Sequence, residues 1–312
     1  MPVRIDAGAD TVHWGYFDAA LAPVATIDSG ETVTIASVSG PPDVLPGPPF
    51  KIPPALPAIH QANTRRMLPG HMLTGPVAVR GARAGQVLQV DIAAIDLAYD
   101  WGYTAHRPLA GALPHDFAER GLAHSRLDAE RMIGHLPWGM EIPLKPFFGV
   151  IGVAPPPAWG TISTLPPRQN GGNLDNKELV AGTTLYLPIF VDGAQFSAGD
   201  GHAVQGDGEV CVNAIETGLV GQFRLTVRDD LKLEWPAAET PTHVMTMAFD
   251  PDLDDCVVIA LRLMLDLIEA RAGLTRSQAY MLASLAADLH ITQVVNGNKG
   301  VHCMLEKKYL KG

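Results

Sequence analysis

Short runs rich in valine, isoleucine and threonine, separated by glycine, proline and aspartate, fill this chain up to about residue 230. The run Thr32–Val38 follows a Ser-Gly turn, and the run Thr183–Val191 ends at Asp192-Gly193. Comparable runs occupy Val77–Arg80, Val87–Ile95, Phe148–Val153, Gly208–Glu216 and Gln222–Val227. These residue types and this turn spacing are typical of a β-sandwich or a β-barrel. We therefore predict a β-rich body over residues 1–235 that carries the active site. The pattern does not distinguish a sandwich from a barrel.

Three stretches of the body lack this alternation of strand-like runs and turn residues. Pro41–Pro57 contains eight prolines and Pro155–Pro167 contains five. Because proline has no backbone N–H to donate to a strand ladder, we expect loops here. Such loops could line a pocket or an interface, or simply connect strands at the surface. Residues 100–145 are predicted to form an irregular insert, with a short helix at Leu122–Ile133.

The pattern changes in the last quarter of the chain. Apolar residues recur with a helical period in Leu253–Ala272, and Gly273 follows as a stop. A capping box at residues 275–278 predicts a second helix over Ser277–Leu289. The runs Ile291–Val295 and Val301–Leu305 predict two strands. Residues 236–312 should therefore form a β-α-α-β unit packed on the body. The predicted class is α+β, predominantly β with a smaller C-terminal unit that contains two helices.

Composition restricts the partners and the compartment. The formal net charge is −10 and no Lys/Arg-rich stretch occurs, which argues against nucleic-acid binding. No apolar run approaches the ~20 residues that span a bilayer, and the N-terminus lacks the apolar core of a signal peptide. The three cysteines have no close pair spacing, which favours reduced thiols. We expect a cytoplasmic protein that binds neither nucleic acid nor membranes.

The densest group of reactive side chains lies in Gly199–Glu209. These eleven residues hold Asp200, His202, Asp207 and Glu209 together with four glycines. Oxygen and nitrogen donors this close together can bind Zn²⁺ or another divalent cation. The alternative is a turn-rich loop whose carboxylates accept hydrogen bonds from its own amides. Spacing alone leaves both open.

A second polar segment holds Asn173 and Asp175 after a pair of glycines. Both side chains could be metal ligands or partners of a substrate amide, although an ordinary turn explains the composition as well. His13, His71 and His302 are isolated histidines, for which packing or capping is the simpler interpretation.

Several hydrolase classes can be tested by their motifs. The sequence contains no GxSxG elbow, no Walker loop and no HExxH pair. The serine- and glycine-rich cluster of the amidase-signature hydrolases is also absent. Cys211 could act as a nucleophile, but it lies in an apolar run that predicts a buried and inert thiol.

The chain resembles the acetamidase/formamidase family in six blocks taken in order from about residue 11 to residue 305. The blocks are HWGYFDAALAPVATIDSGETVTI, GHMLTGPVAVRGARAGQVLQVDI, PFFGVIGVAPP, GGNLDNKELVAGTTLYLPI, GDGHAVQGDGEVCVNAIET and SQAYMLASLAADLHITQVVN. The resemblance implies an amidohydrolase that cleaves a small aliphatic amide, of the formamide or acetamide kind, to a carboxylate and ammonia. It also implies a β-rich body with a smaller α+β part, a bound metal ion and a homo-oligomer, a dimer or larger.

The resemblance also implies roles for particular residues. Asp175, Asp200, His202 and Asp207 are the expected ligands of a divalent metal, zinc in the first place and calcium as the alternative. Glu209 is the expected general base for the attacking water.

Four further residues complete the predicted site. His13 is a catalytic candidate that supports the metal shell or the substrate. Asn173, Gly171 and Gly172 are expected to bind the substrate, the glycines through backbone N–H groups that meet the oxyanion. A cysteine-nucleophile amidase and a non-catalytic binding or assembly protein remain the alternatives. The insert at 100–145 departs most from the family pattern, so a substrate larger than acetamide is conceivable.

Overall fold

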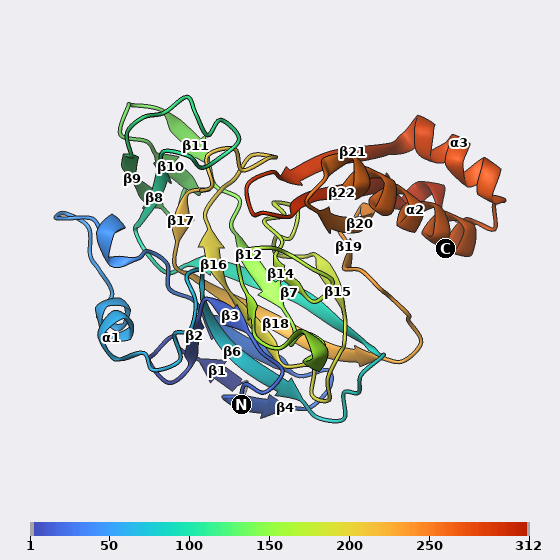
Figure 1. Ribbon diagram of the computed structural model, residues 1–312, viewed down its shortest axis with the longest axis horizontal. Coiled ribbons are helices and arrows are strands. Elements are labelled where there is room, and N and C mark those ends of the chain that lie inside the picture. Colours follow the sequence, from blue (N-terminus) through green and yellow to red (C-terminus); the bar gives the residue numbers. More distant parts are fainter. Residues whose placement is uncertain (1–2, 311–312) are drawn as a thin grey trace.

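Two large β-sheets form the framework of the protein, and the computed structural model describes residues 3–310 (Figure 1). The first sheet has nine strands in the order β1 (Val3–Ile5), β5 (Thr32–Ala36), β18 (Leu219–Arg228), β7 (Val87–Leu97), β15 (Thr184–Pro188), β19 (Ala237–Glu239), β20 (His243–Asp250), β22 (Lys299–Glu306) and β21 (Ala287–Gln293). The second sheet follows the path β11 (Glu141–Pro143), β10 (Ile133–His135), β9 (Gly121–Asp128), β8 (Trp101–His106), β17 (Glu216–Thr217), β16 (Phe196–His202), β12 (Phe147–Gly152) and β14 (Gly171–Asn173). Strand β6 (Met72–Val79) branches from β16 and carries β2 (Val12–Trp14) and β4 (Ala25–Ile27), while β3 (Tyr16–Phe17) pairs separately with β13 (Ile162–Ser163).

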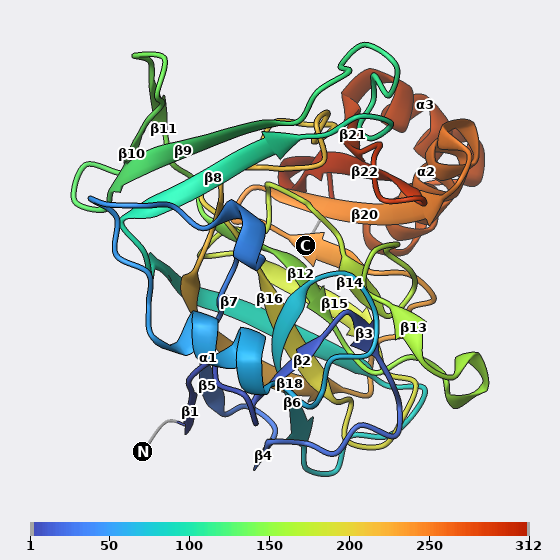
Figure 2. The same ribbon diagram turned by 60° about the vertical axis from the view of Figure 1, so that its left-hand side comes forward.

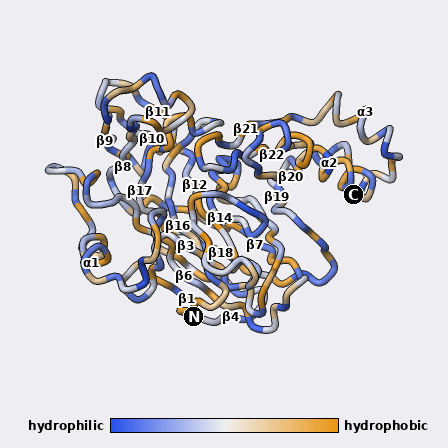
Figure 3. The backbone as a smooth tube through the Cα atoms, in the orientation of Figure 1, coloured by the Kyte–Doolittle hydropathy of each residue, from blue (hydrophilic) through white to orange (hydrophobic). Residues whose placement is uncertain are grey.

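The main hydrophobic core lies between these two sheets. Phe223 of β18 in the first sheet meets Phe148 of β12 and Phe196 of β16 in the second, with ring centroids 5.2 and 5.5 Å apart. All three rings are fully buried. Figure 3 shows hydrophobic residues recurring along the central strands, as this packing requires. The predominantly β fold is thus confirmed. It is a sandwich, and neither sheet closes into a barrel within residues 3–310.

The C-terminal unit extends the first sheet and covers one face of the extension with helices (Figure 2). Helix α2 spans Leu253–Ala272, as expected: the side chain of Asp252 accepts from the N–H of Asp254, and Gly273 ends the helix at a φ of 66°. The predicted capping box opens α3 (Arg276–Ala286). No helix in the described part of the chain is long and apolar enough to cross a membrane.

The second helix ends at Ala286, three residues before its predicted end at Leu289. Ala287, Asp288 and Leu289 belong to strand β21 and pair with Leu305, Met304 and Cys303 of β22. Pairing across the sheet outweighs the helical propensity of these residues. The boundary between the body and the C-terminal unit at residue 235 stays a prediction. Strand β19 begins just after this residue and pairs with β15 of the body.

The prediction for residues 100–145 was wrong. The segment holds no helix at Leu122–Ile133 and forms the antiparallel strands β8 to β11, although residues 107–120 between β8 and β9 are an irregular loop. Alternation within β9 was masked by its polar residues, since this part of the sheet is largely open to solvent. The proline-rich segment before it is mainly loop, as expected. It also contains a 3₁₀ turn (Pro42–Val44) and helix α1 (Ala55–Ala62).

Candidate active site

A cavity of about 790 Å³ opens beside the carboxyl end of β16. Its lining comes from segments far apart in sequence: 41–44, 69–71, 103–107, 163–166, 173–175, 209–216 and 295–297, with Asp200 and Arg120. The wall of the cavity is therefore formed largely by loops that connect the strands of both sheets, including the turn between β21 and β22.

Four ionisable side chains converge around His202 at one end of this cavity. Its Nε2 atom lies 3.3 Å from Glu216 Oε2, 3.4 Å from Asp200 Oδ2 and 3.9 Å from Asp175 Oδ1. His71 Nε2 approaches Asp200 Oδ2 from the other side, at 3.6 Å. The predicted ligands Asp175, Asp200 and His202 are thus brought together.

The backbone places these side chains through strained conformations. Asp175, Asp200 and Glu209 have φ angles of 45°, 56° and 44°, in the left-handed region that non-glycine residues rarely adopt. Asp200 lies in β16 two residues before His202, so the left-handed φ turns its side chain relative to the ordinary alternation of the strand. Strain of this kind costs about 1–3 kcal/mol per residue and concentrates at functional sites.

Gly149 of β12 makes room for the cluster. A Cβ atom at this position would lie 2.6 Å from Asp175 Oδ1, 2.7 Å from His202 Cε1 and 2.8 Å from Asp200 Oδ2. Each distance is shorter than real Cβ contacts allow. The glycine in the PFFGVIGV block is therefore required by the close approach of three site side chains.

The atoms of the cluster that face away from its centre are hydrogen-bonded. His202 Nδ1 lies 2.9 Å from Gln205 Oε1, and Gln205 Nε2 donates to the carbonyl of Asp175, which fixes the orientation of the amide. Asn296 Nδ2 donates to Asp175 Oδ2. Because Nδ1 of His202 donates to the Gln205 oxygen, its Nε2 can present a lone pair to the centre, as metal-bound histidines do.

The atoms that face the centre have no hydrogen-bond partner. Glu216 Oε1 accepts from the N–H of Ala214, but Glu216 Oε2, Asp175 Oδ1, His202 Nε2 and Glu209 Oε2 are buried and unpaired. A buried polar atom without a partner costs about 1–3 kcal/mol. These atoms belong to two groups of possible metal ligands that share His202, Asp175–Asp200–His202 and His202–Glu209–Glu216, and unpaired donors in such groups fit the binding of a cation.

The charges of the cluster shift the pKa values of His202 and Asp200 apart. Burial alone would lower the pKa of His202, but Glu216 and Asp200 raise it well above its ordinary value. Burial alone would raise the pKa of Asp200, but His71 and His202 hold it below its usual range. A positive charge is therefore stabilised at the centre, carried either by the imidazolium or by a bound cation.

Two further carboxyl groups, those of Asp175 and Glu209, bind protons more tightly than usual. Burial raises the pKa of Asp175 to about 6, against the opposing charge of His202. Burial and the neighbouring Asp175 raise the pKa of Glu209 well above its ordinary value. The raised pKa of Glu209 favours its protonated form, as a group that takes up and returns a proton requires.

The loop that carries Glu209 differs from its prediction. The apolar run Val210–Ile215 forms turns, and Val210 is 61% exposed. The loop is tied to the C-terminal unit, because the N–H of Gly208 donates to Thr292 and the N–H of Val294 donates back to Gly208. Cys211, expected to be buried, is half-buried and lines the cavity.

His13 lies away from the cavity surface, within the core. Its Nδ1 atom is 2.8 Å from the carbonyl of Tyr16 and its Nε2 atom is 2.9 Å from Ser197 Oγ. Burial lowers its pKa to about 3, so the ring is neutral. With both ring nitrogens bonded inside the protein, the contacts of His13 are those of a packing residue of β2 that braces β16.

Of the predicted substrate-binding residues, only Asn173 lies at the cavity, and Gly171 and Gly172 do not. Asn173 lines the cavity, where its Oδ1 atom is buried and unpaired while its Nδ2 atom donates to the carbonyl of Leu165. Gly171 and Gly172 pair with β12 and do not line the cavity. The N–H of Gly171 already donates to the carbonyl of Arg168, which leaves it unavailable to an oxyanion.

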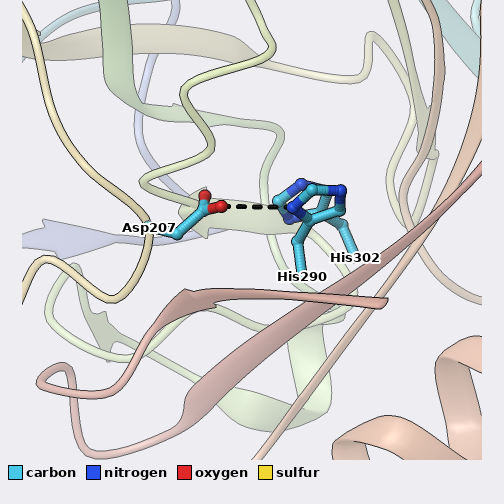
Figure 4. Close-up of side chains that lie close together, drawn as sticks. All are labelled: Asp207, His290 and His302. Carbon is cyan, nitrogen blue, oxygen red and sulfur yellow. Dashed lines mark hydrogen bonds and ion pairs between the residues drawn. The ribbon is translucent and has the colours of Figure 1, made fainter. Parts of the chain in front are cut away.

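Asp207 lies in a second group, with His290 and His302 of the C-terminal unit (Figure 4). Its Oδ2 atom is 3.1 Å from His290 Nδ1 and 3.0 Å from Lys177 Nζ. The two imidazole rings are stacked, with centroids 4.8 Å apart and planes within 4°. A metal shared by two imidazoles must lie in both ring planes, and parallel stacked planes share no point. The arrangement is therefore better explained as an ion pair that fastens the Glu209 loop than as a second metal centre.

Sequence analysis missed three contributors to the main cluster. Glu216 ends the run that was interpreted as a buried strand, and only its charge in an apolar run hinted at a function. Gln205 lies three residues after His202 in the loop that was singled out, but an amide gave no signal of its own. Asn296 follows Asp175 by 121 residues, and no local pattern connects them. His71, left ambiguous, lines the cavity.

Comparison with known proteins supports the resemblance noted above. The profile of the acetamidase/formamidase family matches residues 58–162 and 158–305. The acetamidase of Mycolicibacterium smegmatis is 29% identical over 211 residues, which cover 49% of this chain and 52% of the relative. The formamidase of Methylophilus methylotrophus is 28% identical over 242 residues, covering 58% and 59%. The chain thus spans between half and three fifths of the length of these curated relatives.

A solved structure extends the similarity to the whole chain. The acetamidase from Bacillus halodurans superposes with a TM-score of 0.85 at 30% identity, and the match covers 98% of each chain. The family profile and this superposition together include every residue of the cluster around His202. The chain therefore belongs to the acetamidase/formamidase family.

Proposed function

We propose that this protein hydrolyses the C–N bond of a carboxylic acid amide, releasing a carboxylate and ammonia, with a divalent metal ion held at the cluster around His202. Two groups of possible ligand side chains that share His202 carry the proposal, Asp175–Asp200–His202 and His202–Glu209–Glu216, with four of their buried ligand atoms lacking a hydrogen-bond partner. The relatives named acetamidase and formamidase support the reaction class.

Asp175, Asp200 and His202 are the proposed ligands, with Glu216 as a further oxygen donor. Ligand atoms about 2.0–2.1 Å from a tetrahedral zinc ion lie about 3.3 Å from each other. The separations of 3.3 and 3.4 Å between His202 Nε2 and the oxygens of Glu216 and Asp200 match this value, whereas Asp175 Oδ1 lies farther from His202 Nε2, at 3.9 Å. An imidazole among the ligands favours zinc over calcium, which takes oxygen ligands.

A metal ion at this position would lower the pKa of a water molecule and polarise the amide carbonyl. Glu209 would accept the proton of the attacking water at Oε2 and return it to the departing nitrogen. Its raised pKa and its unpaired Oε2 atom suit both steps. Asn173 Oδ1 would accept a hydrogen bond from the substrate NH₂ group and orient it.

Metal content and ammonia release, measured on the same preparation, test the proposal. We expect a stoichiometric metal ion and ammonia release that stops on chelation and returns with added Zn²⁺. Glu209→Gln should keep the metal and the fold while kcat falls by at least ~10²-fold. Turnover like the wild type in that variant would remove Glu209 from the role. His202→Ala should lose the metal, and full occupancy afterwards would contradict the ligand set.

A cysteine-nucleophile amidase is the second candidate, favoured by the position of Cys211 on the cavity surface. Its Sγ atom lies 3.5 Å from the carbonyl oxygen of Asn213, a contact that does not activate a thiol. Cys211→Ser separates the mechanisms, because it would abolish nucleophilic turnover and leave metal-dependent turnover nearly unchanged.

We also propose that the protein is a homo-oligomer. Helix α3 exposes Tyr280, Met281 and Leu285, and the neighbouring edge strand β21 exposes Leu289 and Ile291. An uncovered apolar face beside an open sheet edge is a common feature of association surfaces. Light scattering of the wild type and of Leu285→Lys tests the assignment, which predicts a smaller species for the variant.

A further inference from the structure

The cavity at the proposed active site is much larger than formamide or acetamide requires. Its volume of about 790 Å³ falls in the range of roughly 300–1,000 Å³ that encloses drug-sized ligands. Acetamide bound at the His202 cluster would leave most of this space to water. The surplus space therefore needs an explanation in terms of the substrate.

Apolar side chains line the cavity beside the ionisable cluster. Val44 and Tyr103 are buried, while Ala105 and Val212 are half-buried. Leu165 is 44% exposed although it lies on the cavity surface. An apolar surface left open beside convergent polar groups is typical of a ligand-binding site.

The charged side chains of the cavity lie at its exposed side or in the cluster around His202. Arg120 is paired with Asp43 through an Nη1–Oδ2 distance of 2.7 Å, and Arg107 is exposed to solvent. Apart from these groups the lining is mostly uncharged. This lining suits an apolar acyl group.

Strand β8, which belongs to residues 100–145, supplies apolar side chains to one side of the cavity. Tyr103 and Ala105 point to one face of the strand and line the cavity, while the hydroxyl of Thr104 between them donates to the carbonyl of Ala214. The rigid antiparallel pairing of β8 with β9 holds these side chains in place. One side of the cavity is thus formed by a paired strand of the sheet.

We infer that the site takes primary amides whose acyl group is an apolar chain or ring extending well beyond acetyl. The inference rests on the proposed amide hydrolysis and names its substrate class. Burial of each additional methylene should raise kcat/KM about four-fold until the chain fills the cavity. Binding energy from the acyl chain can contribute to the reaction at the amide, because it helps to position the reacting group.

A chain-length series tests the inference. kcat/KM would be measured by ammonia release with formamide, acetamide, butyramide, hexanamide and phenylacetamide, using the metal-loaded enzyme. We expect values that rise with acyl size, with hexanamide at least ~10-fold above acetamide. A maximum at formamide or acetamide would overturn the inference and leave the proposed function standing. Ammonia release from none of the amides would remove the proposed function and the inference together.

Two variants of the hairpin separate cavity size from general damage. Ala105→Phe narrows the cavity and should lower kcat/KM for hexanamide at least ~10-fold more than for acetamide. Ala123→Phe is the matched control, because Ala123 of β9 pairs with Thr104 and does not line the cavity. It should leave the whole series unchanged. An equal loss for every amide in Ala105→Phe would contradict the inference.

Leu165→Ser tests the same idea without filling space. The side chain is largely exposed, so the substitution leaves folding intact, and the carbonyl of Leu165 keeps its bond from Asn173. We expect a selective loss for the longer amides. Unaltered selectivity in both Leu165→Ser and Ala105→Phe would show that the acyl group does not reach this surface.

Discussion

The substitution Gly149→Ala gives the sharpest test of the cluster geometry. The added Cβ atom would meet Asp175 Oδ1, His202 Cε1 and Asp200 Oδ2 at 2.6–2.8 Å. Ordinary van der Waals contact begins at 3.4 Å, so each of these groups must retreat by roughly 0.6–0.8 Å. Metal sites tolerate about 0.2 Å of change in their ligand distances. All three proposed ligands would therefore be displaced by a single methyl group.

The expected loss is large in function and small in stability. A misplacement of about 1 Å can lower turnover ~10²-fold, and weakened support of metal ligands lowers affinity about 10- to 100-fold. We expect both effects in Gly149→Ala. The same substitution in the interior of a strand gains about 0.5–1 kcal/mol from restricted backbone freedom. This gain offsets part of the overlap, so the free energy of unfolding should change little.

The assay combines a metal titration, kcat/KM for one amide and thermal unfolding. Gly47→Ala is the control, because a Cβ atom at Gly47 meets nothing within 4 Å and its φ is not positive. The control should match the wild type in all three measurements. Metal affinity and kcat/KM within two-fold of the wild type for Gly149→Ala would refute the claim that the three side chains converge on this glycine.

Three further predictions follow from the contacts described above. Gln205→Ala removes the acceptor of His202 Nδ1, so metal affinity should fall about 10-fold or more while the fold is kept, as measured by metal titration. Asp207→Asn should retain a full complement of metal, because this carboxylate lies outside the cluster around His202; loss of one equivalent would contradict the placement. The contributions of His13 and His302 to the unfolding free energy should fall as pH drops from about 6.5 towards 3, because burial lowers both pKa values to about 3 and the unfolded chain then binds the extra protons, while the raised pKa values of Asp175 and Glu209 contribute with the opposite sign. Each histidine contributes a slope of about 1.4 kcal/mol per pH unit, which chemical denaturation at pH 7 and pH 5 can measure.

Secondary structure was predictable where local pattern and tertiary packing agree. Helix α2 matches its prediction at both ends, since the aspartate cap, the apolar period and Gly273 all specify the same helix. The hairpins at 100–145 were missed because one side of them faces solvent and their polar residues obscure the alternation. The run Val210–Ile215 has the composition of a strand but makes turns, because hydrogen bonds from the C-terminal unit hold the neighbouring backbone of Gly208.

The candidate site was predictable to the extent that its residues are close in sequence. Asp200, His202 and Glu209 stand within one short loop and strand end, so composition alone drew attention to them. His13 and Asp207 were included by association with the same blocks, but each is satisfied by other partners. Which member of a polar block faces the cavity depends on the φ angles and on the neighbouring strand, and neither can be derived from composition.

The cluster needs the C-terminal unit even though its proposed ligands belong to the body. Asn296 donates to Asp175 Oδ2 and thereby turns Oδ1 towards His202. The backbones of Thr292 in β21 and of Val294 just after it both bond to Gly208 and so hold the left-handed Glu209 in place. Conformations with positive φ persist only where surrounding contacts enforce them. The two units distinguished by sequence pattern are therefore one unit in chemical terms, because the strain at the proposed acid–base residue is maintained from across the boundary between them.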